Sequence, residues 1–117
     1  MTKPLKTLRR ERAAKEPALT EAVLLNSLRS TAVNCGWKVY RAQFSMYSTK
    51  GWPDLFMVKN GRAFAWELKS AKGTISEAQV AWIEALQQVP GVDARLVYPS
   101  DLDDAYTALV TGAWPRI

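Results

Sequence analysis

Apolar residues recur along the chain at two different spacings, and these spacings predict its helices and strands. From Pro17 to Cys35 the apolar residues repeat at helical spacing, and Gly36 is placed to end a helix there. From Trp37 to Phe44 large and polar residues alternate, which is typical of a strand. The polar stretch from Ser45 to Trp52 predicts a loop.

The middle of the chain predicts a β-hairpin. Asp54 to Lys59 and Arg62 to Ser70 are mostly apolar, which suits strands that are covered on both faces. Between them lies Asn60-Gly61, the pair that most favours a two-residue turn. Pro53 fits directly before the first of these strands, because no amide donor is needed there.

The last third of the chain predicts a helix, a strand and a helix. Ser76 and Gln79 have the spacing of a capping box that opens the first helix, and Pro90-Gly91 ends it. The apolar face of that helix consists of Trp82, Ile83, Leu86 and Val89. The remaining elements are a buried strand from Ala94 to Tyr98, a helix from Pro99-Ser100-Asp101 to about Val110, and a tail at Trp114-Pro115 that packs back on the domain.

This order of elements predicts the fold class. A three-strand meander is followed by a helical crossover to a fourth strand, so we expect an α/β fold with a mixed four-stranded sheet flanked by helices. The 117 residues and the hydrophobic content of 48% suit one domain. No apolar run is long enough to cross a membrane, and the start has no secretory signal, so we expect a soluble protein of the cytoplasm.

Two scarce residue types restrict the chemistry. Cys35 is the only cysteine, which rules out a disulfide within the chain. The sequence contains no histidine, which leaves almost no ligands for zinc and excludes a Ser-His-Asp triad or a Cys-His pair. Any catalysis must therefore use carboxylates and lysine.

Positive charge is concentrated in residues 1–18. Six basic residues stand against two acidic ones there, which accounts for most of the net charge of +5. A basic arm attached to a balanced domain over residues 19–117 suggests a polyanion partner such as nucleic acid. The alternative is a solvated, frayed terminus.

The predicted hairpin places two carboxylates side by side. Asp54 lies six residues before Asn60 and Glu67 six residues after Gly61, so the two acids should face each other. Their repulsion must be offset by a bound cation, by a nearby Lys or Arg, or by a shared proton. Lys69 should project from the same face as Glu67.

A third acid, Glu21, falls within the apolar stripe of the first helix, and it either complements the helix dipole or points toward the paired acids. The other residues also have structural explanations. Lys69 could be a strand-end lysine that reaches solvent, Gln79 a capping residue, and Asp54 a turn former. Together, however, Asp54 and Glu67 provide the one or two carboxylates that Mg²⁺ usually takes from a protein, and phosphodiester hydrolysis with such a metal needs nothing that this chain lacks.

The ordered set of motifs resembles the PD-(D/E)xK nucleases, and specifically their virus-type replication-repair (VRR-NUC) branch, over roughly residues 20–98. The residues that carry the resemblance are Gly51-Trp52-Pro53-Asp54-Leu55, Glu67-Leu68-Lys69, Ser76-x-x-Gln79 and the helical Glu21. It implies a restriction-endonuclease-like αβββαβ core. Trp52 departs from the smaller aliphatic residue that the family often has before Pro-Asp, which bears on loop packing or substrate contact.

The resemblance also implies roles. Asp54, Glu67 and the carbonyl of Leu68 would bind Mg²⁺ or Mn²⁺, with Glu21 reaching the metal directly or through water. Lys69 would be the catalytic lysine, and Gln79 would support Lys69 or the scissile phosphate. Gly51 would allow a close approach of the chain before the site.

Stand-alone members of this branch resemble four-way (Holliday) junction resolvases that act as homodimers. We therefore expect a homodimeric endonuclease acting on branched or double-stranded DNA, contacted by the basic arm and the Met46-Tyr47 loop. The alternatives are a flap- or duplex-directed nuclease of the same fold, a non-catalytic nucleic-acid-binding module and, more remotely, a membrane-surface protein.

Overall fold

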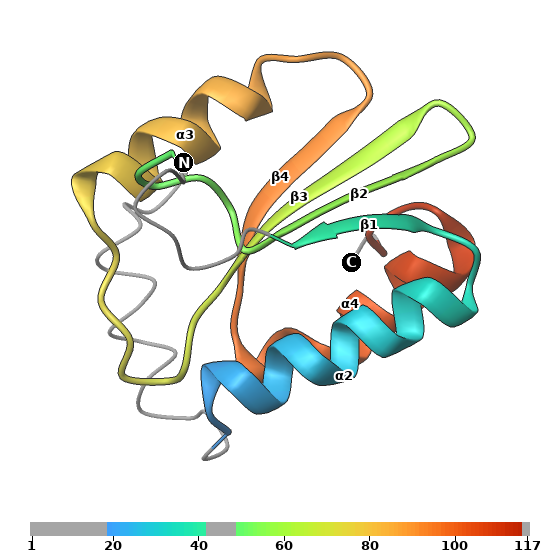
Figure 1. The fold of residues 1–117 in the computed structure, drawn as a ribbon, viewed down its shortest axis with the longest axis horizontal. Coiled ribbons are helices and arrows are strands. Elements are labelled where there is room, and N and C mark those ends of the chain that lie inside the picture. Colours follow the sequence, from blue (N-terminus) through green and yellow to red (C-terminus); the bar gives the residue numbers. More distant parts are fainter. Residues whose placement is uncertain (1–18, 42–48, 116–117) are drawn as a thin grey trace.

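A four-stranded sheet with the strand order β1-β2-β3-β4 forms the centre of the molecule (Figure 1). The computed structural model describes residues 19–41 and 49–115. The strands are β1 (Lys38–Arg41), β2 (Leu55–Lys59), β3 (Arg62–Leu68) and β4 (Val92–Val97). The first three pair antiparallel, whereas β3 and β4 pair parallel, so the predicted α/β fold with a mixed sheet is confirmed.

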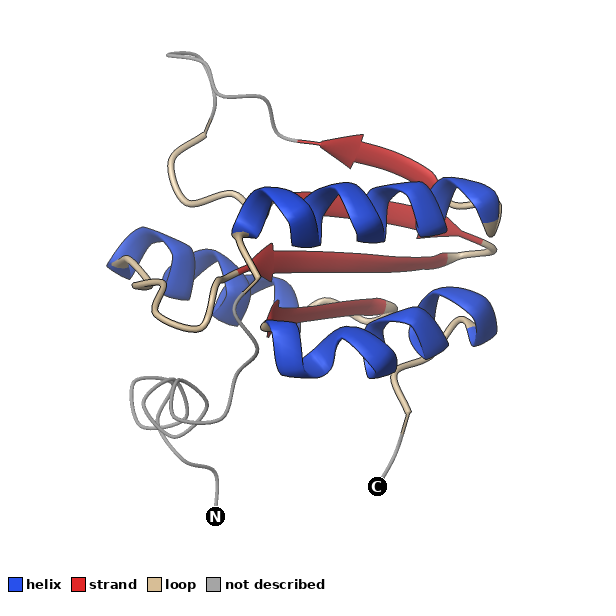
Figure 2. Cartoon of the chain, turned by 90° about the horizontal axis from the view of Figure 1, so that it is seen from below, coloured by secondary structure: helices blue, strands red, loops and turns tan. Residues whose placement is uncertain are grey.

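Helices cover both faces of this sheet (Figure 1 and Figure 2). α2 (Glu21–Asn34) and α4 (Leu102–Thr111), which follows the 3₁₀ turn η1 (Pro99–Asp101), lie on one face. α3 (Glu77–Gln87) lies on the other. No helix of residues 19–41 and 49–115 has both the length and the apolar content needed to cross a membrane.

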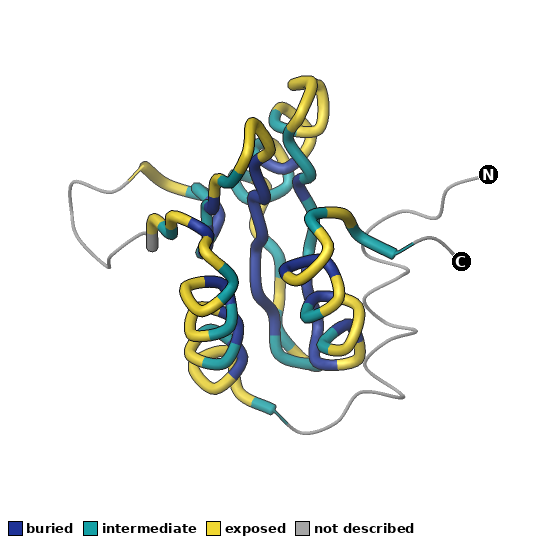
Figure 3. Tube along the Cα trace, turned by 90° about the vertical axis from the view of Figure 1, so that its right-hand side faces the viewer, coloured by how far each residue is buried: buried dark blue, intermediate teal, exposed yellow. Residues whose placement is uncertain are grey.

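Successive side chains along each strand point to opposite faces of the sheet, so the buried residues form two clusters, one on each face. Leu55, Phe64 and Trp66 pack with α2 and α4, and Ala65 packs with Ile83 of α3 in a smaller cluster. The helices are buried toward the strands and exposed on their outer sides (Figure 3). Trp114 packs back on the larger cluster, with its ring centroid 5.5 Å from that of Trp66, which confirms the predicted tail.

The β2–β3 hairpin has the predicted turn and register. Asn60 and Gly61 have φ angles of 50° and 77°, the two positive values of a type I′ turn. Lys59 pairs with Arg62, and the ladder continues to Leu55 opposite Trp66. The next step of the same register places Asp54 opposite Glu67.

Several predicted boundaries are wrong by a few residues. β2 begins at Leu55 and not at Asp54, and β3 ends at Leu68 and not at Ser70, because its pairing with β4 ends at Val97. β4 begins two residues earlier than predicted. Val89, expected on the apolar face of α3, follows the helix and is 47% exposed.

Other predictions fall outside the described residues. These are the basic arm, the start of the first helix at residues 17–18, the end of the first strand at residues 42–44 and the Met46-Tyr47 loop.

Candidate functional site

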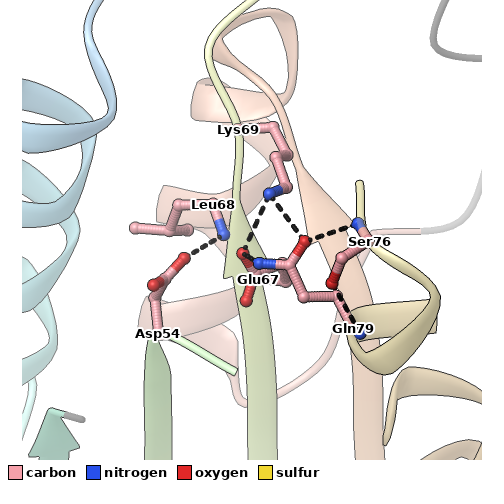
Figure 4. A network of polar contacts seen from close by, with 6 residues as sticks. All are labelled: Asp54, Glu67, Leu68, Lys69, Ser76 and Gln79. Atoms are coloured by element: carbon pink, nitrogen blue, oxygen red, sulfur yellow. Dashed lines mark hydrogen bonds and ion pairs between the residues drawn. The ribbon is translucent and has the colours of Figure 1, made fainter. Parts of the chain in front are cut away.

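The two facing acids lie at the end of β3 where the antiparallel pairing stops (Figure 4). Asp54 directly precedes β2, and Glu67 is the second-last residue of β3. Both alternate with residues of the larger core cluster, such as Leu55 and Trp66, and therefore point to the opposite face, where α3 lies. The side chains of β3, β2 and α3 meet there.

Glu67 is a buried carboxyl whose two oxygens have different surroundings. It is only 2% exposed. Oε2 accepts a hydrogen bond from Gln79 Nε2 at 2.9 Å and lies 3.3 Å from Lys69 Nζ. No donor from the described residues reaches Oε1. Oε1 is thus a buried acceptor that a proton or a cation would satisfy.

Burial is the main cause of a large shift in the pKa of Glu67, from 4.5 to about 8. The negative charge of Asp54 raises this pKa further, whereas Lys69 lowers it. Without a bound cation, Glu67 is mostly protonated at neutral pH. The repulsion between Asp54 and Glu67 is therefore offset in two of the three ways expected from the sequence, by a proton on Glu67 and by the nearby Lys69.

Lys69 follows β3 and is almost completely buried, with 5% exposure. Its Nζ donates to Gln79 Oε1 at 2.9 Å and pairs with Glu67 Oε2. A strand-end lysine that reaches solvent would not show this burial, so that explanation of Lys69 is wrong. The ammonium is directed into the site.

The backbone of Leu68 also faces Asp54. The Leu68 amide donates to Asp54 Oδ2 at 2.8 Å, so Asp54 is held by the backbone of β3. The Lys69 amide points the other way and donates to Val97 on β4 at 3.0 Å. Since this peptide is trans, its carbonyl, that of Leu68, points away from β4 and toward the side where Asp54 lies.

Gln79 joins the site to the start of α3. The predicted capping box is present: the Ser76 hydroxyl accepts from the Gln79 amide at 3.1 Å, and Gln79 Oε1 accepts from the Ser76 amide at 2.9 Å. The same Gln79 side chain contacts Lys69 and Glu67. The capping role and the site role are combined in one residue.

Glu21 lies at the rim of the site and is exposed. A Cβ added at Gly73 would lie 3.2 Å from Glu21 Oε1 and 3.3 Å from Cδ of Lys69, so these two side chains flank the same glycine. α2 therefore brings Glu21 to the loop that follows Lys69. The sequence gives no sign of this role of Gly73, because a loop glycine has the same appearance in any turn.

The loop before Asp54 is held against α3. Gly51 has φ +86°, and a Cβ there would lie 2.6 Å from the backbone carbonyl of Ala78. The ring centroid of Trp52 lies 5.0 Å from that of Trp82 and 5.5 Å from that of Phe56. The unusual Trp52 thus contributes to loop packing.

The residues present suit a hard divalent cation. The carboxyl groups of Asp54 and Glu67 and the Leu68 carbonyl, which points to the Asp54 side of β3, are oxygen ligands of the kind that Mg²⁺ and Mn²⁺ prefer, and Glu67 Oε1 has no donor among the described residues. Groups of three or more His, Cys, Asp or Glu residues with metal-holding geometry do not occur in the described part of the chain. Asp54, Glu67 and Leu68 would hold the cation, with Glu21 at the rim.

The structure thus brings together Asp54, Glu67, Lys69 and Gln79, and places Glu21 beside the Lys69 stem. Comparison of the chain with protein-family models, with curated proteins and with solved structures found no match.

Proposed function

We propose that the protein is a Mg²⁺- or Mn²⁺-dependent DNA endonuclease of the PD-(D/E)xK type, with the restriction-endonuclease-like core that its resemblance to the VRR-NUC branch implies. The observation that carries the proposal is the pair of facing carboxylates, Asp54 and Glu67, with the buried Lys69 ammonium 3.3 Å from the second of them. The order of the described elements is that of the αβββαβ core.

The residues of the site have complementary tasks in phosphodiester hydrolysis. Asp54, Glu67 and the Leu68 carbonyl would hold the cation. When bound, it would polarise the phosphate and favour ionisation of a water molecule. Lys69 supplies positive charge that compensates the charge developing on the phosphate, and its burial strengthens that effect.

The substrate is branched DNA, with a four-way junction as the first choice. The described part of one chain offers one such site, which would cut one strand, so symmetric resolution of a junction needs two copies related by a twofold axis. The basic arm, with its excess of Lys and Arg, adds phosphate contacts that are sensitive to salt. A flap- or duplex-directed nuclease would use the same residues.

A matched pair of lysine variants tests this function. Lys69→Met should lower the cleavage rate of a labelled four-way junction with Mg²⁺ about 100-fold or more, since it removes a buried charge near the phosphate. Lys72→Met, which changes an exposed lysine three residues away, should cleave like the unmodified protein. Flap and linear duplex substrates at the same concentration identify the preferred structure.

Equal cleavage by the two variants would refute the catalytic assignment of Lys69. A protein that binds these DNAs but cleaves none of them, with either metal, would be a binding module and not a nuclease.

A further inference from the structure

The surrounding groups allow only one orientation of the side-chain amide of Gln79. Its Oε1 faces two donors, the Ser76 amide and Lys69 Nζ, both at 2.9 Å (Figure 4). Its Nε2 faces an acceptor, Glu67 Oε2, also at 2.9 Å. The reversed amide would set Nε2 against two donors and Oε1 against a carboxylate oxygen.

The Ser76 amide is the fixed member of this set. It belongs to the backbone at the start of α3, where the Ser76 hydroxyl also accepts a hydrogen bond from the backbone N–H of Gln79. Lys69 and Glu67 are side chains that could each turn, whereas the first turn of a helix cannot do so without unfolding. The capping box therefore sets the direction in which Gln79 presents its oxygen and its nitrogen.

We propose that Gln79 is a positioning residue: the α3 capping box fixes its side-chain amide, which in turn holds the Lys69 ammonium and engages Oε2 of Glu67, so that Oε1 is left with no donor among the described residues. Both ends of the amide are used within the protein, and this assigns Gln79 to the support of Lys69 and not to contact with the phosphate. The catalytic role of Lys69 and Glu67 rests on the proposed nuclease function, but their positioning by Gln79 does not.

Three variants distinguish the contacts of Gln79 with Lys69 and Glu67 from its role in capping α3. Gln79→Met removes both site contacts and one capping-box bond. Gln79→Glu keeps an oxygen for Ser76 and Lys69 but removes the donor to Glu67. Gln87→Met is the matched control, because Gln87 lies at the other end of α3 and the change removes only its Nε2 bond to the Ala94 carbonyl of β4.

The readouts are the ¹⁵N ammonium signal of Lys69 in NMR spectra, Mn²⁺ affinity by calorimetry, and the melting temperature. Gln79→Met should shift or broaden the Lys69 signal and weaken Mn²⁺ binding about 10-fold, the effect typical of losing a partner of a metal ligand. Gln79→Glu should keep the Lys69 signal but weaken Mn²⁺ binding. Gln87→Met should lower only the melting temperature, by a few degrees.

A Lys69 signal in Gln79→Met that matches the unmodified protein, with only the melting temperature lowered, would overturn the proposal and leave Gln79 as a helix cap. If the unmodified protein neither bound Mn²⁺ nor cleaved DNA, but Gln79→Met still changed the Lys69 signal, the nuclease function would fail while the positioning role stood.

Discussion

Glu67 is the residue of the site whose protonation responds most strongly to its surroundings. Its burial and the adjacent Asp54 favour the neutral acid, and its pKa of about 8 means that a proton occupies the pair when no cation does. A cation would have to displace that proton, so metal binding near neutral pH should release close to one proton per site. The proton and the cation thus compete for the same carboxyl.

The raised pKa of Glu67 makes stability depend on pH. Between pH 4.5 and about 8 the folded protein keeps a proton that the unfolded chain releases, so the free energy of unfolding should fall as pH rises, by at most about 1.4 kcal/mol per unit. Glu67→Gln cannot ionise and should lose this slope, becoming more stable than the unmodified protein near pH 8. Urea unfolding with EDTA at several pH values measures it.

The matched control for this experiment is Glu84→Gln, which changes an exposed acid on α3 and should keep the slope. If Glu67→Gln and the unmodified protein gave parallel curves, the pKa of Glu67 would not be raised in the folded state.

At the scale of elements, the parts of the site that depend on local sequence could be predicted. Asn60-Gly61 determines a two-residue turn with little help from the rest of the fold, and the register of Asp54 and Glu67 follows from it. The capping box of α3 is similarly local. The burial of Lys69 and the contact of Glu21 with the loop at Gly73 depend on the packing of distant segments, which residue spacing does not specify.

Gly51 joins two elements of the site, and its replacement should damage both stability and metal binding. In Gly51→Ala the positive φ costs about 1–2 kcal/mol, and the clash with the Ala78 backbone at 2.6 Å adds to this, so we expect a total loss of about 2–4 kcal/mol. Gly61→Ala is the control, because its φ is also positive but no atom lies within 4 Å of the added Cβ. Urea unfolding and Mn²⁺ calorimetry compare them.

Equal losses of stability for these two variants would show that the contact between Gly51 and Ala78 is unimportant. The loop before Asp54 would then be held by other contacts, such as those of Trp52.

In the molecule as a whole, helix N-termini lie toward the site, and helix C-termini lie at the opposite end of the molecule, beside the turn of the β2–β3 hairpin. α2 begins beside Gly73 and α3 begins at the Gln79 contacts, so the N-termini of these two helices lie toward the site. Their partial positive charge would favour the phosphate of the proposed DNA substrate. At the opposite end, Lys59 and Arg62 of the hairpin donate to the last carbonyls of α2 and α4, those of Cys35 and Gly112.

This division predicts that the hairpin end affects stability but not the site. Lys59→Met should lower the free energy of unfolding by about 1 kcal/mol, because it removes a cation from the C-terminus of α2, and should leave Mn²⁺ affinity unchanged. Lys38→Met, at an exposed position of β1, should change neither. A change in Mn²⁺ affinity for Lys59→Met would contradict the separation of the two ends.

The most direct test of the nuclease site is the cleavage of a labelled four-way junction by the unmodified protein and by Asp54→Asn, each with Mg²⁺ and with EDTA. We expect the unmodified protein and the control Asp103→Asn, an exposed acid on α4, to cleave with Mg²⁺ and not with EDTA. Asp54→Asn, which loses one of the two facing carboxylates, should be at least about 100-fold slower. Cleavage by Asp54→Asn at the unmodified rate, or cleavage that persists in EDTA, would contradict the assignment of Asp54 and Glu67 as metal ligands.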